Sequence, residues 1–169
     1  MQPLKAISVT QPWSTLIAIG GKNIETRSWR TDYHGWIAIH AAKSMHGADE
    51  MRCLREPFYS ALRKAGLKIP CRLERGAHLT LTRGAIVAVA NLHKVERIRI
   101  RAADGATIIP SWPIPKEEIP FGDYTPGRYA WVLTNSRPLK EPIPCRGALG
   151  LWDVPAEIAE QLERGGYLR

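Results

Sequence analysis

The N-terminal part of the chain changes from a short apolar run to helical spacing. Leu4 to Val9 predicts a short first strand. Trp13, Leu16 and Ile17 then recur at i, i+3 and i+4, the spacing that gives a helix one apolar stripe facing a core. Gly20-Gly21 predicts the end of this helix, because glycine readily takes the left-handed conformation found at helix C-termini.

Two alternating runs follow the glycines. The first gives one face of a predicted strand an acid, a base and a flat aromatic ring. The residues of that face are Asn23, Glu25, Arg27 and Trp29. The second run, Trp36 to Ala41, places His40 on one face with Trp36 and Ala38. The charged face is also compatible with an ordinary solvated strand that carries a Glu–Arg pair.

The rest of the pattern predicts a helical stretch divided into two helices, several strands and a C-terminal helix. Residues 48–66 have helical spacing and are expected to break at Pro57, whose ring clashes with a continuing turn. Residues 67–83 show no period and predict a loop. Further on, the pattern predicts a buried strand at 84–90 with a half-exposed extension to 101, a long ordered loop at 110–127, strands at 128–133 and 147–154, and a helix at 155–163.

These elements favour an α+β fold. Many short strands with few helices between them predict a small closed β-barrel with helices at its rim. An α/β fold would need a helix between most strands, and the chain offers too few. At 169 residues we expect a single domain over 1–169, with a helical insertion at about 45–80.

Composition excludes several classes of protein and favours a cytoplasmic location. No apolar run approaches the roughly 18 residues of a membrane span, and the N-terminus lacks the apolar segment of a signal peptide. The three cysteines, Cys53, Cys71 and Cys145, form no C-x-x-C pair. The chain has no P-loop, no G-x-G-x-x-G and no H-E-x-x-H spacing. We therefore expect no metal, no cofactor and no membrane partner.

The charge of +8 suggests a polyanionic partner. Residues 47–83 hold eight Lys or Arg against four acids, and residues 1–46 hold five against two. Residues 110–127 reverse the sign, with one lysine against three acids. The positive excess therefore accompanies the N-terminal half of the chain.

The motifs of the chain resemble those of the ASCH domain family, which belongs with PUA-like β-barrels. The matching pieces occur in the order of the family. They are Gln11-Pro-Trp13, the Gly20-to-Trp29 run G-x-K-x-x-E-x-R-x-W (from Gly20), the Tyr33-x-Gly35 turn, Ile39-His-Ala41, Gly84 to Ala90, Gly127 to Leu133, Pro142 to Gly147 and Leu151-Trp152. The resemblance implies a PUA-like barrel and binding of nucleic acid.

The family-matched segments supply a set of candidate nucleic-acid contacts. They are Lys22, Arg27, Trp29, Arg30, His40, Lys43, Ser44 and Arg146. Cations neutralise phosphates and flat rings stack on bases, so these residues predict a basic, aromatic-lined cleft for DNA or RNA. Trp36, Trp131 and Trp152 are expected near it, although Trp13 and Trp131 are also expected to pack in the core.

Two other functions stay open from the sequence. Some small members of the ASCH family are credited with amidohydrolase activity on acylated cytidine-type nucleosides, through a Lys-x-x-Thr segment and a distant Glu. Lys22 matches that lysine, but Glu25 stands where the threonine is expected, so a hydrolase acting on a modified nucleoside or on RNA would depend on Lys22 and Glu25. The same two residues could instead form a surface ion pair. A protein adaptor would use the proline-rich loop at 110–126. The sequence predicts no oligomeric state.

Overall fold

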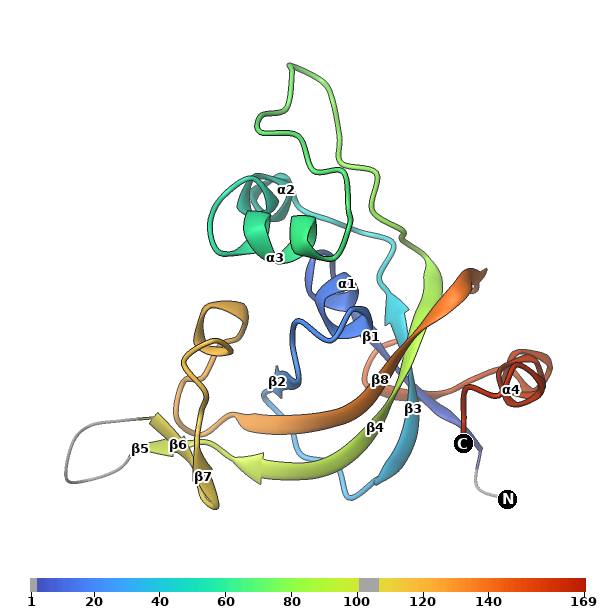
Figure 1. Cartoon of the computed structure of the whole chain (residues 1–169). Helices are drawn as coiled ribbons and strands as arrows, with labels where there is room; N and C mark the ends of the chain where they lie inside the picture. The colour runs from blue at the N-terminus through green and yellow to red at the C-terminus, as the bar shows by residue number, and fades with distance from the viewer. Residues whose placement is uncertain (1–2, 101–106) are drawn as a thin grey trace.

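A curled six-stranded sheet forms the centre of the molecule (Figure 1). The computed structural model describes residues 3–100 and 107–169. The strands of this sheet are β1 (Lys5–Val9), β2 (Ile24–Arg27), β3 (Gly35–Ala41), β4 (Ala85–Arg97), β8 (Tyr129–Pro144) and β9 (Leu151–Asp153). They lie side by side in the order β2-β8-β4-β3-β1-β9. β1 is parallel to β3, and the other neighbouring pairs are antiparallel.

Helices and a small second sheet surround the curled sheet. The α-helices are α1 (Trp13–Ala18), α2 (Gly47–Cys53), α3 (Phe58–Lys64) and α4 (Ala156–Arg164). The second sheet joins β5 (Arg99–Ile100), β6 (Thr107–Ile109) and β7 (Trp112–Pro113). The 3-10 helix η1 spans Ile119–Phe121, so the segment predicted as a long loop contains a short strand and a helical turn.

The predicted helix after residue 12 forms as α1 and packs on the curled sheet. Leu16 and Ile17 are fully buried, while Trp13 is half-buried. The amide of Thr15 donates to the Gln11 side chain, which satisfies one of the amides that a helix start leaves free. Gly20 has a φ of 72° and ends the helix as predicted.

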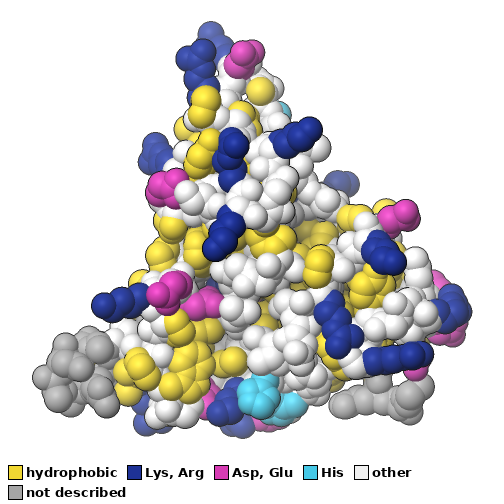
Figure 2. Space-filling model, viewed as in Figure 1, with side chains coloured by type: hydrophobic (Ala, Val, Ile, Leu, Met, Phe, Trp, Pro, Cys, Tyr) yellow, Lys and Arg dark blue, Asp and Glu magenta, His cyan; other side chains and the backbone are white. Residues whose placement is uncertain are grey.

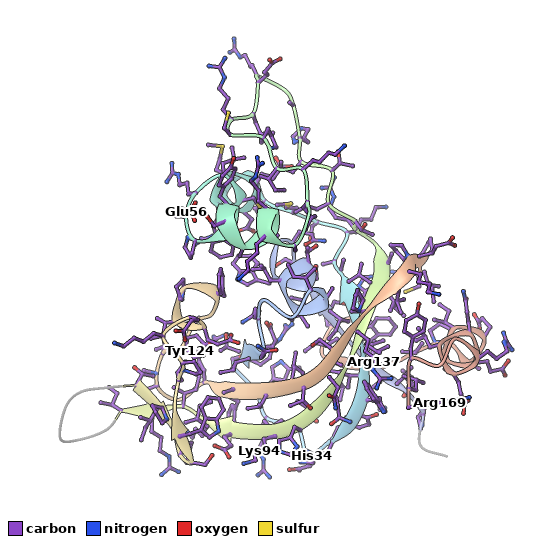
Figure 3. The ribbon with its side chains drawn as sticks, viewed as in Figure 1. His34, Glu56, Lys94, Tyr124, Arg137 and Arg169 are labelled. Atoms are coloured by element: carbon purple, nitrogen blue, oxygen red, sulfur yellow. The ribbon has the colours of Figure 1, made fainter. Side chains whose placement is uncertain are left out.

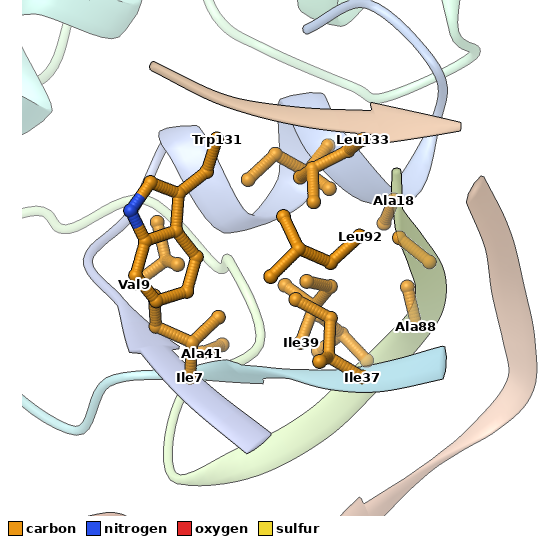
Figure 4. Close-up of a cluster of buried hydrophobic side chains, with 13 residues drawn as sticks. Ile7, Val9, Ala18, Ile37, Ile39, Ala41, Ala88, Leu92, Trp131 and Leu133 are labelled. Carbon is orange, nitrogen blue, oxygen red and sulfur yellow. The ribbon is translucent and has the colours of Figure 1, made fainter. Parts of the chain in front are cut away.

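The main core lies between α1 and the concave face of the sheet (Figure 4). Apolar side chains from β1, β3 and β4 meet Trp131 and Leu133 of β8 there, as the alternation along β8 predicts. Trp131 is fully buried, and the Trp29 ring packs edge-on against it at a centroid distance of 4.7 Å. This core fixes the strands whose ends carry the site.

The predicted C-terminal helix forms as α4 and covers another part of the sheet (Figure 1). Its stripe of Ile158 and Leu162 packs in a second cluster with Ala6, Ala38 and Val89. These sheet residues alternate with those of the main core, so both faces of the central strands are buried.

The segment between β3 and β4 forms a third packed unit (Figure 1). α2 and α3 are separate helices on either side of the predicted break at Pro57. Phe58, Leu62 and Leu79 pack against Leu16 of α1 and Phe121 of η1. That residues 45–80 are an insertion into a single domain remains a prediction. No helix in the described ranges is both long enough and apolar enough to span a bilayer.

The α+β class is confirmed, but the predicted closed barrel is not: the sheet is a curled half-barrel with two edges, β2 and β9. β2 pairs only with β8, and β1 already has β3 and β9 as neighbours. Closure would require a ladder between the edges. Instead, the Arg27 guanidinium of β2 donates to the Ser8 carbonyl of β1 at 2.9 Å, so a side chain connects the two strands.

The strand predicted at 128–133 is too short, because β8 continues to Pro144. Pro138 lies opposite Ala88 of β4, at one of the register shifts in the β4–β8 ladder. Proline lacks an amide hydrogen but is tolerated at such irregularities. Asn135, with a φ of 52°, marks a further local irregularity. Pro138 therefore lies at an irregular point within this strand and does not end it.

We predict that Leu92→Ala lowers the free energy of unfolding by about 3 kcal/mol, since it empties a fully buried position of the main core. Leu149→Ala is the matched control. Leu149 is 98% exposed, and its truncation should change the free energy of unfolding by less than about 0.5 kcal/mol. Urea unfolding of both variants measures the difference, and equal losses would contradict this placement of the core.

Candidate functional site

Two cavities meet at Ser8, on opposite sides of the C-terminal part of β1. The first, which we name the basic cavity, has a volume of about 850 Å³. Its lining residues are Ser8, His40, Ala42, Lys43, Arg83, Gly84, Pro144, Cys145, Arg146, Gly147, Ala148 and Leu149. The second, the mixed cavity, has a volume of about 410 Å³. Its lining residues are Ser8, Val9, Thr10, Trp13, Glu25, Thr26, Arg27, Arg52, Pro120, Phe121, Gly122 and Asp123.

The basic cavity combines three cations with a largely apolar lining. Lys43, Arg83 and Arg146 are exposed, and they come from three separate segments of the chain. No carboxylate is found among the described residues that line it. Within 3–100 and 107–169 none of the three cations forms an ion pair. The cavity therefore attracts anions.

His40 and Ser8 form a hydrogen-bonded floor to the basic cavity. His40 is buried, with Nε2 at 3.2 Å from the Cys145 carbonyl and Nδ1 at 3.1 Å from the Ser8 hydroxyl. Burial lowers the pKa of His40 below its ordinary value of 6.5, although the Cys145 carbonyl opposes this shift. The neutral ring then donates from Nε2 to Cys145 and accepts at Nδ1.

Gly147 packs directly on this floor. A Cβ at position 147 would lie 2.6 Å from the Ser8 hydroxyl and would also overlap the His40 ring. Ser8 in turn accepts from the Trp152 indole at 3.2 Å and can donate to the Ala148 carbonyl at 3.1 Å. The glycine of the Pro142-to-Gly147 motif is therefore required by close packing, and the loop after β8 is fixed against β1 and β3.

The mixed cavity is electrostatically balanced. Two carboxylates, of Glu25 and Asp123, and two guanidinium groups, of Arg27 and Arg52, belong to its lining. Arg27 Nε lies 3.2 Å from a Glu25 oxygen, and the Arg52 guanidinium lies over the Trp13 ring at 5.6 Å from its centroid. This cavity is suited to a ligand with polar groups of both kinds rather than to a simple anion.

Lys22 is buried, with 1% of its side chain exposed, so the alternative of a surface ion pair with Glu25 is wrong. Its ammonium donates to the Ile24 carbonyl and lies 3.8 Å from Glu25 Oε2. Burial lowers the pKa of Lys22, and the Glu25 and Glu118 carboxylates oppose that shift. In this conformation the ammonium has no open side toward a phosphate.

Glu118 connects this buried group to the loop that follows β7. One of its carboxylate oxygens accepts the Asn23 amide at 2.6 Å, and the other lies 3.5 Å from the Tyr124 hydroxyl. Burial and the Glu118 charge raise the pKa of Tyr124, which Figure 3 shows in the same loop. The buried Glu118 carboxylate thus holds this loop against the start of β2. No local sequence pattern predicted this contact.

The structure divides the predicted site residues among different surroundings. His40, Lys43 and Arg146 meet in the basic cavity, whereas Arg27 and Glu25 line the mixed cavity. Trp29 packs on Trp131, Arg30 pairs with Asp32, and exposed Ser44 lines neither cavity. Their roles in binding remain predictions.

The predicted aromatic lining is located elsewhere. Trp36 lies under the guanidinium of Arg137 (labelled in Figure 3), which also donates to carbonyls after α4. Trp152 packs on His40. Trp13 and Phe121 are the aromatic residues that line the mixed cavity. Within the described residues neither cavity has both a net positive charge and a Trp, Tyr or Phe ring in its lining.

Several lining residues were missed by the sequence analysis, and three of them show why. Arg83 precedes the Gly84 strand start, and its place beside a matched glycine was the available signal. Arg52 belongs to a helix whose cations were expected to be solvated, and only the fold brings it to Trp13. Leu149 follows the Gly147 motif, but no period marks it as exposed.

Comparison with known proteins identifies the domain. A sequence model described as the ASCH domain matches residues 7–143. The crystal structure of ASCH from Zymomonas mobilis is similar at 12% identity and a TM-score of 0.51, covering 97% of this chain and 96% of that one. A mutant of that protein gives 14% identity and a TM-score of 0.49, covering 96% and 98%. At such identity the likeness concerns the fold alone. No curated protein sequence matches.

Because burial lowers the pKa of His40, the unfolded chain takes up a proton at this residue at a higher pH than the folded chain does. The stability contributed by neutral His40 is therefore present above about pH 6.5 and is lost as the pH falls through the folded pKa.

We predict that between about pH 7.5 and about pH 5.5 the wild type loses more unfolding free energy than His40→Gln. His93→Gln, at an exposed position, should keep the wild-type pH dependence. Equal losses in all three proteins would contradict the assignment.

Proposed function

The chain belongs to the ASCH domain family, and from this premise we propose that it binds nucleic acid, with the phosphates held at the basic cavity. The family is generally thought to bind RNA, which makes RNA the first ligand to test. The observation that carries the proposal is a set of three cations around an open cavity. Among the described residues these cations form no ion pair, and the lining has no carboxylate. Cations placed in this way neutralise phosphates and release counterions.

The size and lining of the basic cavity support the same proposal. Its volume of about 850 Å³ lies within the usual range of about 300–1,000 Å³ for small-ligand pockets, so it has room for a nucleotide. The apolar part of the lining suits a base or sugar, and the cations suit the phosphate. The mixed cavity offers no such excess of charge, because its lining has two carboxylates for its two arginines.

Further cations extend from the basic cavity along the segment between α3 and β4. Exposed cations of this segment are Lys68, Arg72 and Arg75, and Lys64 at the end of α3 is also exposed. Figure 2 shows Lys and Arg side chains at the narrow end of the molecule that this segment forms in Figure 1. Arg83 belongs to the same segment and lines the cavity, so this segment adds positive charge to the part of the chain that leads into the cavity.

We propose a supporting role for Lys22 rather than a direct contact. The buried ammonium lies between the Ile24 carbonyl and Glu25, and Glu25 in turn holds Arg27 at 3.2 Å. Arg27 bridges to Ser8. Lys22 therefore orients the charged wall of the mixed cavity through its neighbours.

The mixed cavity supports a second candidate function, hydrolysis of an acylated nucleoside. Glu25 has 12% of its side chain exposed, lines this cavity, and lies against a lysine whose pKa is lowered by burial. A carboxylate next to a lysine of lowered pKa is a pair that can exchange protons with a bound substrate. The same pair supported this alternative in the sequence, and it is separable from phosphate binding by mutation.

We predict that RNA binding weakens with salt. For roughly four phosphate contacts on a duplex, the slope of log affinity against log salt should be near −3.6. Lys43→Ala, Arg83→Ala and Arg146→Ala should each reduce the magnitude of this slope by about 0.9, whatever the RNA sequence. Lys116→Ala removes the same charge from an exposed position outside the cavity and should leave the slope unchanged. Fluorescence anisotropy titrations measure the slopes, and a flat salt response would exclude the proposed function.

Lys22→Met separates the two candidates, because it keeps the length of the side chain and removes the charge. We predict an RNA salt slope equal to that of the wild type, since the Lys22 ammonium is buried. If the protein is a hydrolase, Lys22→Met and Glu25→Gln should both abolish turnover of N4-acetylcytidine, followed by chromatography, without changing RNA affinity. A slope smaller by about one unit in Lys22→Met would instead show that this lysine contacts phosphate.

A further inference from the structure

Leu149 is an apolar side chain presented almost completely to solvent. It is 98% exposed, far more than the other exposed large apolar residues, Met51, Ile100 and Ile119. Its position is between Gly147 and β9, on the rim of the basic cavity. A leucine exposed to this degree contributes nothing to the core, so its apolar surface is available to a partner.

The turn that carries Leu149 is held in place from both sides. On one side Gly147 packs on His40 and Ser8, and the Ser8 hydroxyl can donate to the Ala148 carbonyl. On the other side Leu151 pairs with Ile7 of β1. Gly150, with a φ of 70°, allows the chain to turn sharply between these anchors. Leu149 is therefore presented by a fixed turn.

The surroundings of Leu149 identify the chemistry of its partner. Lys43, Arg83 and Arg146 line the same cavity, which has no carboxylate in its described lining. The complementary ligand carries a negative charge and, directly beside that charge, a flat apolar surface. A base next to its own phosphate satisfies both requirements. In a duplex the base faces are stacked on their neighbours and only the backbone and groove edges are open.

We propose that the basic cavity binds an unpaired nucleotide, with the phosphate at Lys43, Arg83 and Arg146 and the base face against Leu149. This rests on the proposed function and deepens it, because it names single-stranded nucleic acid as the ligand class. The cations fix the backbone, and the leucine contributes only where a base is free to leave the stack. Duplex RNA reaches the cations but leaves the leucine exposed.

The test compares Leu149→Ala with the wild type on three kinds of fluorescein-labelled RNA. The first is a single-stranded oligouridine, and the second is a series of the same strand with an abasic residue at each position in turn. The third is a blunt duplex of equal length. Leu149→Ala should weaken single-strand binding about fivefold, since partial burial of a leucine contributes roughly 1 kcal/mol. Duplex binding should not change. On the strand whose abasic residue occupies the cavity, wild type and variant should bind equally. Ile119→Ala, another exposed apolar truncation, should match the wild type on every RNA.

The outcomes separate this proposal from the one on which it rests. If no RNA binds, the proposed function fails and the unpaired-nucleotide site fails with it. If RNA binds with the expected salt slope but Leu149→Ala changes single-strand and duplex binding alike, or neither, the basic cavity binds phosphate and the proposal is overturned. It is also overturned if Leu149→Ala abolishes binding to anionic lipid vesicles while RNA affinity is unchanged, because the leucine then serves a membrane surface. Leu149→Trp, with a larger flat surface, should tighten single-strand binding alone.

Discussion

Both cavities depend on the hydrogen bonds of one residue, Ser8. Its carbonyl accepts Arg27 from β2, which connects the two strands where the barrel stays open. Its hydroxyl contacts His40 and the Ala148 carbonyl and accepts the Trp152 indole. The ladder between β1 and β9 covers Lys5 to Ile7 and stops before Ser8. On that side of β1, Ser8 therefore has no paired residue in β9. The end of a ladder thus leaves backbone and side chain free to organise a wall of each cavity.

The two cavities differ in charge because of how their cations are compensated. Around Lys22 the ammonium is out of water, and Glu25, Glu118 and a carbonyl compensate for the lost hydration. Glu25 also pairs with Arg27, and the lining of the mixed cavity has two carboxylates for its two arginines, so this cavity has little net field. Lys43, Arg83 and Arg146 come from loops at the ends of strands, where water solvates them and carboxylates are not required. Only cations of the second kind can exchange water and counterions for phosphate.

Local periodicity predicted the elements whose burial is decided by near neighbours. α1, α4, the break at Pro57 and the inward residues of β8 all follow from spacing, because a stripe or an alternation directly encodes which side faces the core. The burial of Lys22 could not be predicted in this way, since it depends on Glu118, which is far away in the chain. The same holds for Arg52, which reaches the mixed cavity only through the packing of the α2–α3 segment. The prediction ended this strand at Leu133, whereas β8 continues past Pro138 at a register shift that local alternation does not reveal.

The proton count on the floor of the basic cavity explains why a polar network is tolerated in a buried place. With His40 neutral there are three donors, the Trp152 indole, the His40 Nε2–H and the Ser8 hydroxyl. The indole donates to Ser8, Nε2 donates to Cys145, and the hydroxyl has two acceptors at equal distance, His40 Nδ1 and the Ala148 carbonyl. Every buried donor is therefore satisfied, and the spare acceptor costs little. A protonated ring would add a donor at Nδ1, so the Ser8 hydroxyl would donate to the Ala148 carbonyl instead. The ring would also carry a positive charge without a counterion in the described lining. The network thus avoids an uncompensated charge only with the neutral histidine, and in that state it holds the loop that presents Arg146 and Leu149 against β1.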